Sequence, residues 1–122
     1  MLQVQGVSRR FGETVALDEA SLTVPAGSVV GFVGGNGAGK TTTMRIIMGL
    51  LAADAGAVRF RGSPVTAHDR RRFGYMPEER GLYPKQQVLD QLTYLGSLRG
   101  MPPNDARRVA LRYLTRFGLA DK

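Results

Sequence analysis

The sequence has 122 residues and a formal net charge of +7, with 17 lysine and arginine residues against 10 acidic residues. This length is enough for one domain at most, and the absence of cysteine excludes disulfides and thiolate metal sites. The apolar stretches are too short to cross a bilayer, and the basic balance suits an anionic partner such as nucleic acid, a membrane surface or a nucleotide.

Five short segments are predicted to form strands, because each is rich in apolar or β-branched residues and most are bounded by glycine and proline turns. The first alternates apolar and polar residues, which is typical of an edge strand. The third is apolar almost throughout and is predicted to be buried on both faces. The five segments are residues 2–7, 21–24, 28–33, 57–61 and 73–76.

Two amphipathic helices are predicted toward the carboxyl terminus, at residues 87–99 and 104–117. Asn104 is the expected N-cap of the second helix, and Gly118 is the expected stop. The predicted apolar faces are Val88, Leu92 and Leu95 in the first helix, and Ala106, Val109, Ala110, Tyr113 and Phe117 in the second.

A glycine-rich stretch, GGNGAGKTTT at residues 34–43, follows the third predicted strand. It leads into a predicted helix at residues 44–48, which Gly49 is expected to cap. The spacing matches the phosphate-binding pattern G-x-x-x-x-G-K-[ST], and the order strand, loop, helix is the context which that pattern requires. The alternative interpretation is a chance glycine turn in front of a helix.

The residue types of this loop suit a polyphosphate. The first turn of a helix offers N–H groups without internal partners, and Gly35, Gly37 and Gly39 can turn further N–H groups inward by adopting positive φ. Lys40 is expected to contact the β- and γ-phosphates, and the Thr41 hydroxyl is expected to ligate Mg²⁺. The predicted nucleotide-binding residues of the loop are Gly34, Asn36, Gly37, Ala38, Gly39, Lys40, Thr41 and Thr42, the last at the α-phosphate.

The order and spacing of these elements resemble the first half of the nucleotide-binding domain of ATP-binding cassette (ABC) transporters. The resemblance covers the whole chain, and its carriers are SRRFGETVALDEASLTVPAGSVVGFVGGNGAGKTTTMRIIMGLL, DAGAVRFRG and FGYMPEERGLYPKQQVLDQLTYLGSLRGM. It implies an α/β fold, the P-loop nucleoside triphosphatase fold in part, with an antiparallel β subdomain. It also implies a β-rich front and P-loop core at residues 1–76, a Q-loop at 77–85 and the start of a helical subdomain at 86–122.

The resemblance implies two further site residues. Phe11 matches the family's aromatic residue that stacks on adenine, and the alternative is an ordinary core phenylalanine. Glu78 stands where the family's Q-loop has a glutamine that senses the γ-phosphate and Mg²⁺. A carboxylate can also ligate Mg²⁺, directly or through water, and the alternative is a solvated loop acid.

The function implied is that of an ATP-binding subunit that couples ATP binding and hydrolysis to export, with ATP and Mg²⁺ as ligands. PEERGLYPK is most similar to ABC-2-type exporters. The implied partners are transmembrane permease subunits and a second nucleotide-binding domain, at the cytoplasmic face of the cell membrane. The family's signature motif, Walker B motif and switch histidine are expected beyond Lys122, so this chain is expected to bind nucleotide without hydrolysing it. No catalytic residue is assigned, and His68 is interpreted as a surface histidine.

Two other functions stay open at this point. One is a soluble ATPase of the same superfamily that acts on nucleic acid or ribosomes, and the other is a non-catalytic nucleotide-binding module. The arginine run at residues 70–72 has no interleaved aromatic residues, which favours a solvated surface over a nucleic-acid patch. No nucleic-acid partner is therefore expected.

Overall fold

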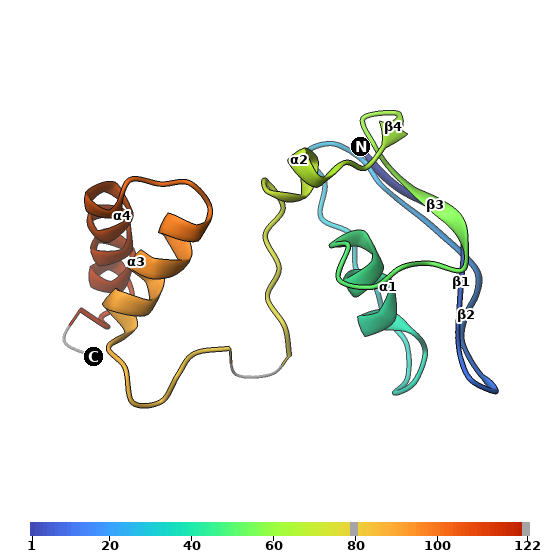
Figure 1. Cartoon of the computed structure of the whole chain (residues 1–122), viewed down its shortest axis with the longest axis horizontal. Helices are drawn as coiled ribbons and strands as arrows, with labels where there is room; N and C mark the ends of the chain where they lie inside the picture. The colour runs from blue at the N-terminus through green and yellow to red at the C-terminus, as the bar shows by residue number, and fades with distance from the viewer. Residues whose placement is uncertain (79–80, 121–122) are drawn as a thin grey trace. The chain divides into compact units, whose positions relative to one another are not determined.

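The structure is a computed structural model that describes residues 1–78 and 81–120. The chain divides into two compact units, Met1–Tyr75 and Met76–Lys122, and each is described by itself. Figure 1 shows the strands and the first two helices in the first unit, and the last two helices in the second. Within the described residues, no helix combines the length and the apolar character needed to span a bilayer.

An antiparallel sheet forms most of the first unit, with the strand order β2-β1-β3-β4. Its strands are β1 (Leu2–Phe11), β2 (Thr14–Val24), β3 (Ala55–Phe60) and β4 (Ser63–Pro64). The first two are longer than predicted, because they pair along a hairpin whose ladder runs from Leu2 opposite Val24 to Phe11 opposite Thr14. Cross-strand hydrogen bonding therefore extends each strand beyond the segment that the apolar pattern marks.

Helix α1 (Lys40–Ile47) packs against this sheet and completes the small core. The buried hydrophobic side chains of this core are Val4, Val7, Leu17, Ile46 and Ile47. The predicted helix end is confirmed. Gly49 has φ +71°, its N–H donates to Ile46 O at 3.0 Å, and the N–H of Leu50 donates to Arg45 O at 2.9 Å. These two bonds form the glycine-terminated cap that satisfies the last carbonyls of a helix.

A second, short helix, α2 (Ala67–Arg70), follows β4 and begins at a capping box between Thr66 and Asp69. Arg70 at its end donates from Nε to the carbonyl of Ile47 at 3.2 Å and is only partly exposed. For this residue the solvated-surface interpretation is therefore wrong, because its guanidinium holds the end of α1. His68 is exposed, as expected.

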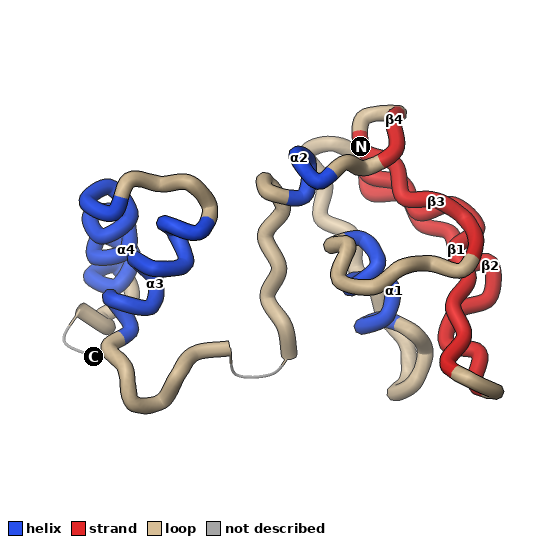
Figure 2. Tube along the Cα trace, viewed as in Figure 1, coloured by secondary structure: helices blue, strands red, loops and turns tan. Residues whose placement is uncertain are grey.

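Two predicted strands, residues 28–33 and 73–76, are wrong. Both segments are non-strand connections (tan in Figure 2), and none of the described strands pairs with them. Val29 and Val33 are almost fully exposed, although the composition of the first segment indicated burial on both faces. An apolar, β-branched segment becomes a strand only where a neighbouring strand accepts its hydrogen bonds, and the described residues supply no such neighbour.

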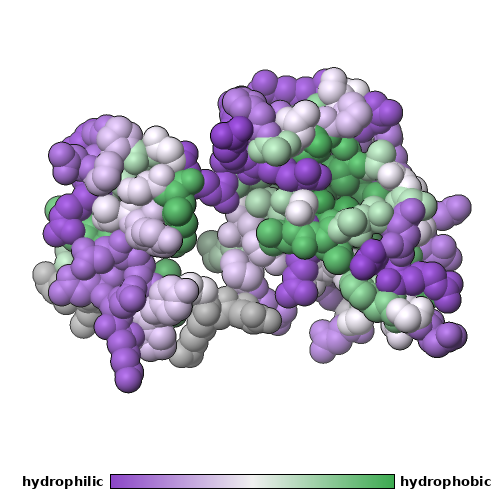
Figure 3. Space-filling view, in the orientation of Figure 1, coloured by the Kyte–Doolittle hydropathy of each residue, from purple (hydrophilic) through white to green (hydrophobic). Residues whose placement is uncertain are grey.

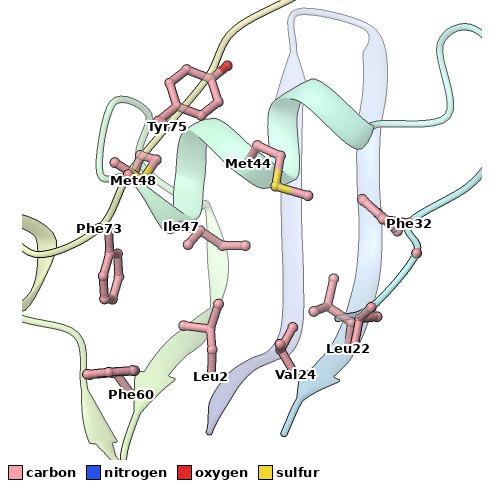
Figure 4. Close-up of a pocket in the computed structure, with 13 residues that line it drawn as sticks. Leu2, Leu22, Val24, Phe32, Met44, Ile47, Met48, Phe60, Phe73 and Tyr75 are labelled. Carbon is pink, nitrogen blue, oxygen red and sulfur yellow. The ribbon is translucent and has the colours of Figure 1, made fainter. Parts of the chain in front are cut away.

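An apolar cavity of about 470 Å³ lies between the sheet and α1. Figure 4 shows side chains from three parts of the first unit around it: Leu22 of the sheet, Met44 of α1, and Phe32 and Phe73 of the two non-strand connections. The space-filling view shows apolar side chains gathered on this face of the first unit (Figure 3). The core of the first unit is therefore open where those segments pass.

The second unit consists mainly of α3 (Val88–Leu98) packed against α4 (Pro103–Arg116). Gly96 permits the close approach of the two helices, because a Cβ added there would lie 2.9 Å from the Cβ of Ala106. The predicted stop at Gly118 is confirmed by its φ of +67° and by the bond from Leu119 N to Leu114 O at 2.8 Å.

Two expectations for α4 are wrong. The helix begins at Pro103 with Pro102 as N-cap, so Asn104 lies inside the first turn. Proline suits the first helical position because its fixed φ is already helical and its missing N–H would have no partner there. Tyr113 and Phe117 are 49% and 69% exposed, whereas Leu114 is buried. The buried stripe thus runs through Ala106, Ala110 and Leu114, as fourfold spacing on a helix allows.

Candidate functional site

The glycine-rich loop turns into α1 through two residues with positive φ. Gly37 has φ +81° and Gly39 has φ +84°, as predicted, whereas Gly35 does not adopt a positive φ. The N–H of Ala38 donates to the carbonyl of Gly35 at 3.3 Å, which closes a turn inside the loop. Residues with a side chain rarely adopt these φ values, so the two glycines determine how the loop enters the helix.

Gly39 also has to be glycine because of its neighbours in β2. A Cβ added there would lie 2.5 Å from Leu17 Cδ2 and 2.6 Å from Ala16 O. Leu17 is itself buried in the core of the first unit. The loop is therefore seated directly on the middle of β2, and the position of α1 depends on that contact.

The start of α1 has the features of an anion-binding helix terminus. The helix begins at Lys40 with Gly39 as N-cap, no side chain caps it, and its first turn contains no acidic residue. The first internal bond runs from Thr43 N to Gly39 O at 2.8 Å. The N–H groups of Lys40, Thr41 and Thr42 therefore have no helical partner, and they add to the positive end of the helix dipole.

The three other described helices each have an acid in the first turn: Asp69 in α2, Asp90 in α3 and Asp105 in α4. An acid at this position offsets the positive end of a helix dipole. Among the described helices, α1 alone leaves that end without a carboxylate.

Lys40 lies across its own loop. Its Nζ donates to the carbonyl of Gly34 at 2.7 Å and to that of Gly35 at 2.7 Å. An ammonium group has three donors, so these two bonds leave one for another acceptor. The lysine thus holds the start of the loop and places a positive charge beside the free N–H groups of α1.

Phe11 is 48% exposed and ends β1, where it faces Thr14 across the hairpin. It is therefore not a core residue, which removes the alternative interpretation. Along β2, the Leu17 that supports Gly39 lies three residues after Thr14. Figure 1 shows the hairpin turn and the loop before α1 at the same end of the first unit. Strand β2 thus carries both Thr14, which faces Phe11, and Leu17, which contacts the glycine-rich loop.

Arg9 lies beside Phe11 and was not predicted from the sequence as a site residue. The guanidinium carbon of Arg9 lies over the Phe11 ring, 5.0 Å from its centroid, and Nη1 donates to Asp54 Oδ1 at 2.6 Å. The other carboxylate oxygen, Oδ2, accepts from Arg10 N at 2.8 Å. These bonds, with the Arg10 N–H first, lower the pKa of Asp54 below its ordinary value of 3.8. The only signal in the sequence was the spacing of Arg9 and Phe11 on one strand face, which did not reveal Asp54.

Glu78 is exposed and belongs to the second unit, whereas Thr41 belongs to the first. Its role at a metal ion therefore stays a prediction, and the neighbouring Glu79 lies outside the described residues. The part of the chain that the structure describes contains no group of three or more His, Cys, Asp or Glu residues that could hold a metal ion by itself.

Similarity to known proteins identifies the family of this chain. The family described as "ABC transporter" matches residues 17–122. The chain is 45% identical over 121 residues to YhaQ of Bacillus subtilis, an ABC transporter ATP-binding protein, and the match covers 99% of this chain and 41% of that relative. It is 37% identical to the sulfate/thiosulfate import ATP-binding protein CysA of Bordetella pertussis, with coverage of 97% and 34%.

The chain is also similar to an export protein. It is 35% identical over 111 residues to the Nod factor export ATP-binding protein I of Ralstonia nicotianae, with coverage of 88% of this chain and 35% of that relative. Among solved structures, the ATP-binding subunit of an ABC transporter superposes with a TM-score of 0.77 at 30% identity, over 97% of this chain and 50% of that one. A nucleotide-free ATP-binding cassette gives a TM-score of 0.68, over 92% and 45%. The chain thus spans half or less of the length of these relatives. The two superposed structures confirm the predicted α/β fold class.

Proposed function

The chain belongs to the ABC transporter ATP-binding family, and from this membership we propose that it is the ATP-binding part of a subunit that drives export across a membrane. The observation that carries the proposal is the start of α1. Three free N–H groups, the ammonium of Lys40 and two positive-φ glycines meet there without a carboxylate in the first turn. This combination suits a polyphosphate.

The proposed binding uses residues 34–42 for the phosphates. The N–H groups of Lys40, Thr41 and Thr42 donate to phosphate oxygens, and the free donor of the Lys40 ammonium reaches the β- and γ-phosphates. Lys40 Nζ bonds to the carbonyls of Gly34 and Gly35, so its third N–H can donate to a phosphate oxygen while these two bonds hold the loop. The base is proposed to stack on Phe11, which is half exposed at the end of the hairpin.

The Thr41 hydroxyl is proposed to ligate Mg²⁺ together with phosphate oxygens, and the Glu78 carboxylate, in the second unit, stays a separate predicted metal ligand. Thr41 is exposed in the first turn of α1, where its hydroxyl is available. When bound, Mg²⁺ neutralises charge on the β- and γ-phosphates, which is its usual contribution in nucleotide triphosphatases. The lack of a three-residue metal cluster among the described residues fits a metal ion that arrives with the nucleotide.

The proposed partners are transmembrane permease subunits and a second ATP-binding domain, at the cytoplasmic side of the membrane. Named relatives include an importer and an exporter, so the direction rests on the exporter-like stretch PEERGLYPK. Residues 77–85 and the helix after them are proposed to contact the permease. Cross-linking from this segment in the assembled transporter is expected to reach a cytoplasmic loop of the membrane subunit, and cross-links from the sheet alone would contradict this surface.

Calorimetric titration with Mg–ATP tests the nucleotide site. Lys40→Ala is expected to weaken binding roughly ten- to a hundredfold, equivalent to about 1.5–3 kcal/mol for a hydrogen bond to a charged group. Arg45→Ala is the matched control, because Arg45 is an exposed cation on the same helix outside the loop. Circular dichroism verifies that both variants are folded. Equal affinity in the wild type and Lys40→Ala would contradict the proposal.

A further inference from the structure

Arg9 is fixed in place by a carboxylate that comes from a different part of the chain. Asp54, which precedes β3, accepts from Arg9 Nη1 at 2.6 Å through Oδ1 and from Arg10 N at 2.8 Å through Oδ2. The N–H of Asp54 in turn donates to the carbonyl of Ser8 at 2.9 Å. The backbone bond to Ser8 and the bond from Arg10 N therefore fix Asp54 beside β1, and its other carboxylate oxygen accepts from the Arg9 guanidinium.

The position of Arg9 is not that of an ordinary surface arginine. Its side chain is 24% exposed, and its Nε is buried with no acceptor among the described residues. A buried donor without an acceptor is costly, and an arginine extended into water would avoid that cost. The guanidinium instead lies over the face of Phe11, 5.0 Å from the ring centroid, which is within the range of a cation–π interaction.

We propose that Arg9 and Asp54 are positioning residues for the nucleotide base. Arg9 covers one face of the Phe11 ring and limits its rotation, so that the opposite face is presented to the base; Asp54 holds Arg9 in that position. This inference rests on the proposed stacking of the base on Phe11. It predicts that loss of either Arg9 or Asp54 weakens binding of the base and leaves binding of the phosphates unchanged.

The test compares ATP with inorganic triphosphate, which has no base. Binding of both ligands is measured by calorimetry for the wild type, Arg9→Leu, Asp54→Ala and the control Arg10→Leu. Arg10 is next to Arg9 and is exposed, and only its backbone N–H contacts Asp54. Arg9→Leu and Asp54→Ala are expected to weaken ATP binding about two- to fivefold, the fold-change of a partly exposed cation–π contact, without changing triphosphate binding. Arg10→Leu is expected to leave the ratio of the two affinities unchanged.

A double-mutant cycle separates positioning from a general structural effect. In a Phe11→Ala background, Arg9→Leu is expected to cause no further loss of ATP affinity, because its effect acts through the ring. If Arg9→Leu weakens ATP and triphosphate equally, or weakens ATP by the same factor with Phe11 absent, Arg9 does not position the ring and the inference is overturned. If Phe11→Ala itself leaves the ratio of the two affinities unchanged, the proposed stacking fails and the inference fails with it. If Phe11→Ala lowers the ratio of ATP affinity to triphosphate affinity but Arg9→Leu leaves that ratio at the wild-type value, the inference about Arg9 is overturned and the proposed stacking on Phe11 stands.

Discussion

Leu17 of β2 lies directly against Gly39 at the start of α1, so that a Cβ added to Gly39 would stand 2.5 Å from Leu17 Cδ2. This contact joins the hairpin of β1 and β2, whose first strand ends at Phe11, to the loop that we propose binds phosphate. The two ends of the proposed nucleotide site are therefore held by the two paired strands of one hairpin. A substitution that separates Leu17 from Gly39 should affect stability and nucleotide binding together.

Gly39→Ala is expected to destabilise the first unit for two reasons. The residue has φ +84°, which costs a non-glycine residue about 1–2 kcal/mol, and the new methyl group adds an overpacking cost of about 1–3 kcal/mol. Gly62→Ala is the matched control, because Gly62 has φ +86° with nothing within 4 Å of an added Cβ. Urea unfolding measures both. Equal losses of unfolding free energy in the two variants would show that the Leu17 contact does not hold the loop.

The sequence predicted this loop and the glycine caps of α1 and α4 because each depends on local chemistry. Positive φ at Gly37, Gly39, Gly49 and Gly118 is a requirement that few other residues satisfy, so its signal is visible in the sequence. The strand predicted at residues 28–33 failed because a strand also needs a partner, which is not a local property.

Two further features could not be predicted for similar reasons. Asp54 is far from Arg9 in the chain, and only the pairing of β1 with β3 brings its carboxylate to the guanidinium. The buried stripe of α4 contains Leu114 in place of Tyr113, because the packing of α3 selects which of several apolar residues face inward. Periodicity marks the helix, but its exact orientation depends on the neighbouring helix.

The carboxyl group of Asp54 is expected to titrate below 3.8, because the Arg10 N–H and the Arg9 guanidinium favour its charged form. A lowered pKa in the folded state adds stability above the ordinary value, and that contribution is lost as the pH falls through the folded value. Carboxyl carbon chemical shifts measure the titration. In Arg9→Leu the pKa is expected to rise only part of the way to 3.8, because the Arg10 bond is the largest cause and persists. A full return to the ordinary value would show that Arg9 is the dominant partner.

Gln91 is expected to hold the loop in front of α3 against that helix. The residue is 6% exposed, its Oε1 accepts from Tyr83 N at 2.7 Å, and its Nε2 donates to Tyr83 O and Gln86 O, both at 3.0 Å. Gln91→Ala leaves the three backbone groups without these partners and is expected to reduce the unfolding free energy by about 1–3 kcal/mol.

Gln87→Ala serves as the comparison for this prediction, since Gln87 is the exposed N-cap residue of the same helix and its side chain makes no capping bond. Amide hydrogen exchange provides the direct readout. Faster exchange at Tyr83 in Gln91→Ala, but not in Gln87→Ala, is the expected result. Unchanged exchange at Tyr83 in both variants would mean that the loop is held by other contacts.

Heteronuclear NMR titration with Mg–ATP tests most directly whether the start of α1 binds phosphate. The amide protons of Lys40, Thr41 and Thr42 have no helical acceptor, so new bonds to phosphate oxygens should move their resonances downfield and slow their exchange. The same titration with Lys40→Ala should require a higher concentration of nucleotide for the same shifts. We expect the largest changes at residues 37–42 and smaller changes at Phe11. Saturable binding of ATP that leaves the amides of residues 37–42 unchanged would contradict binding of phosphate at the start of α1.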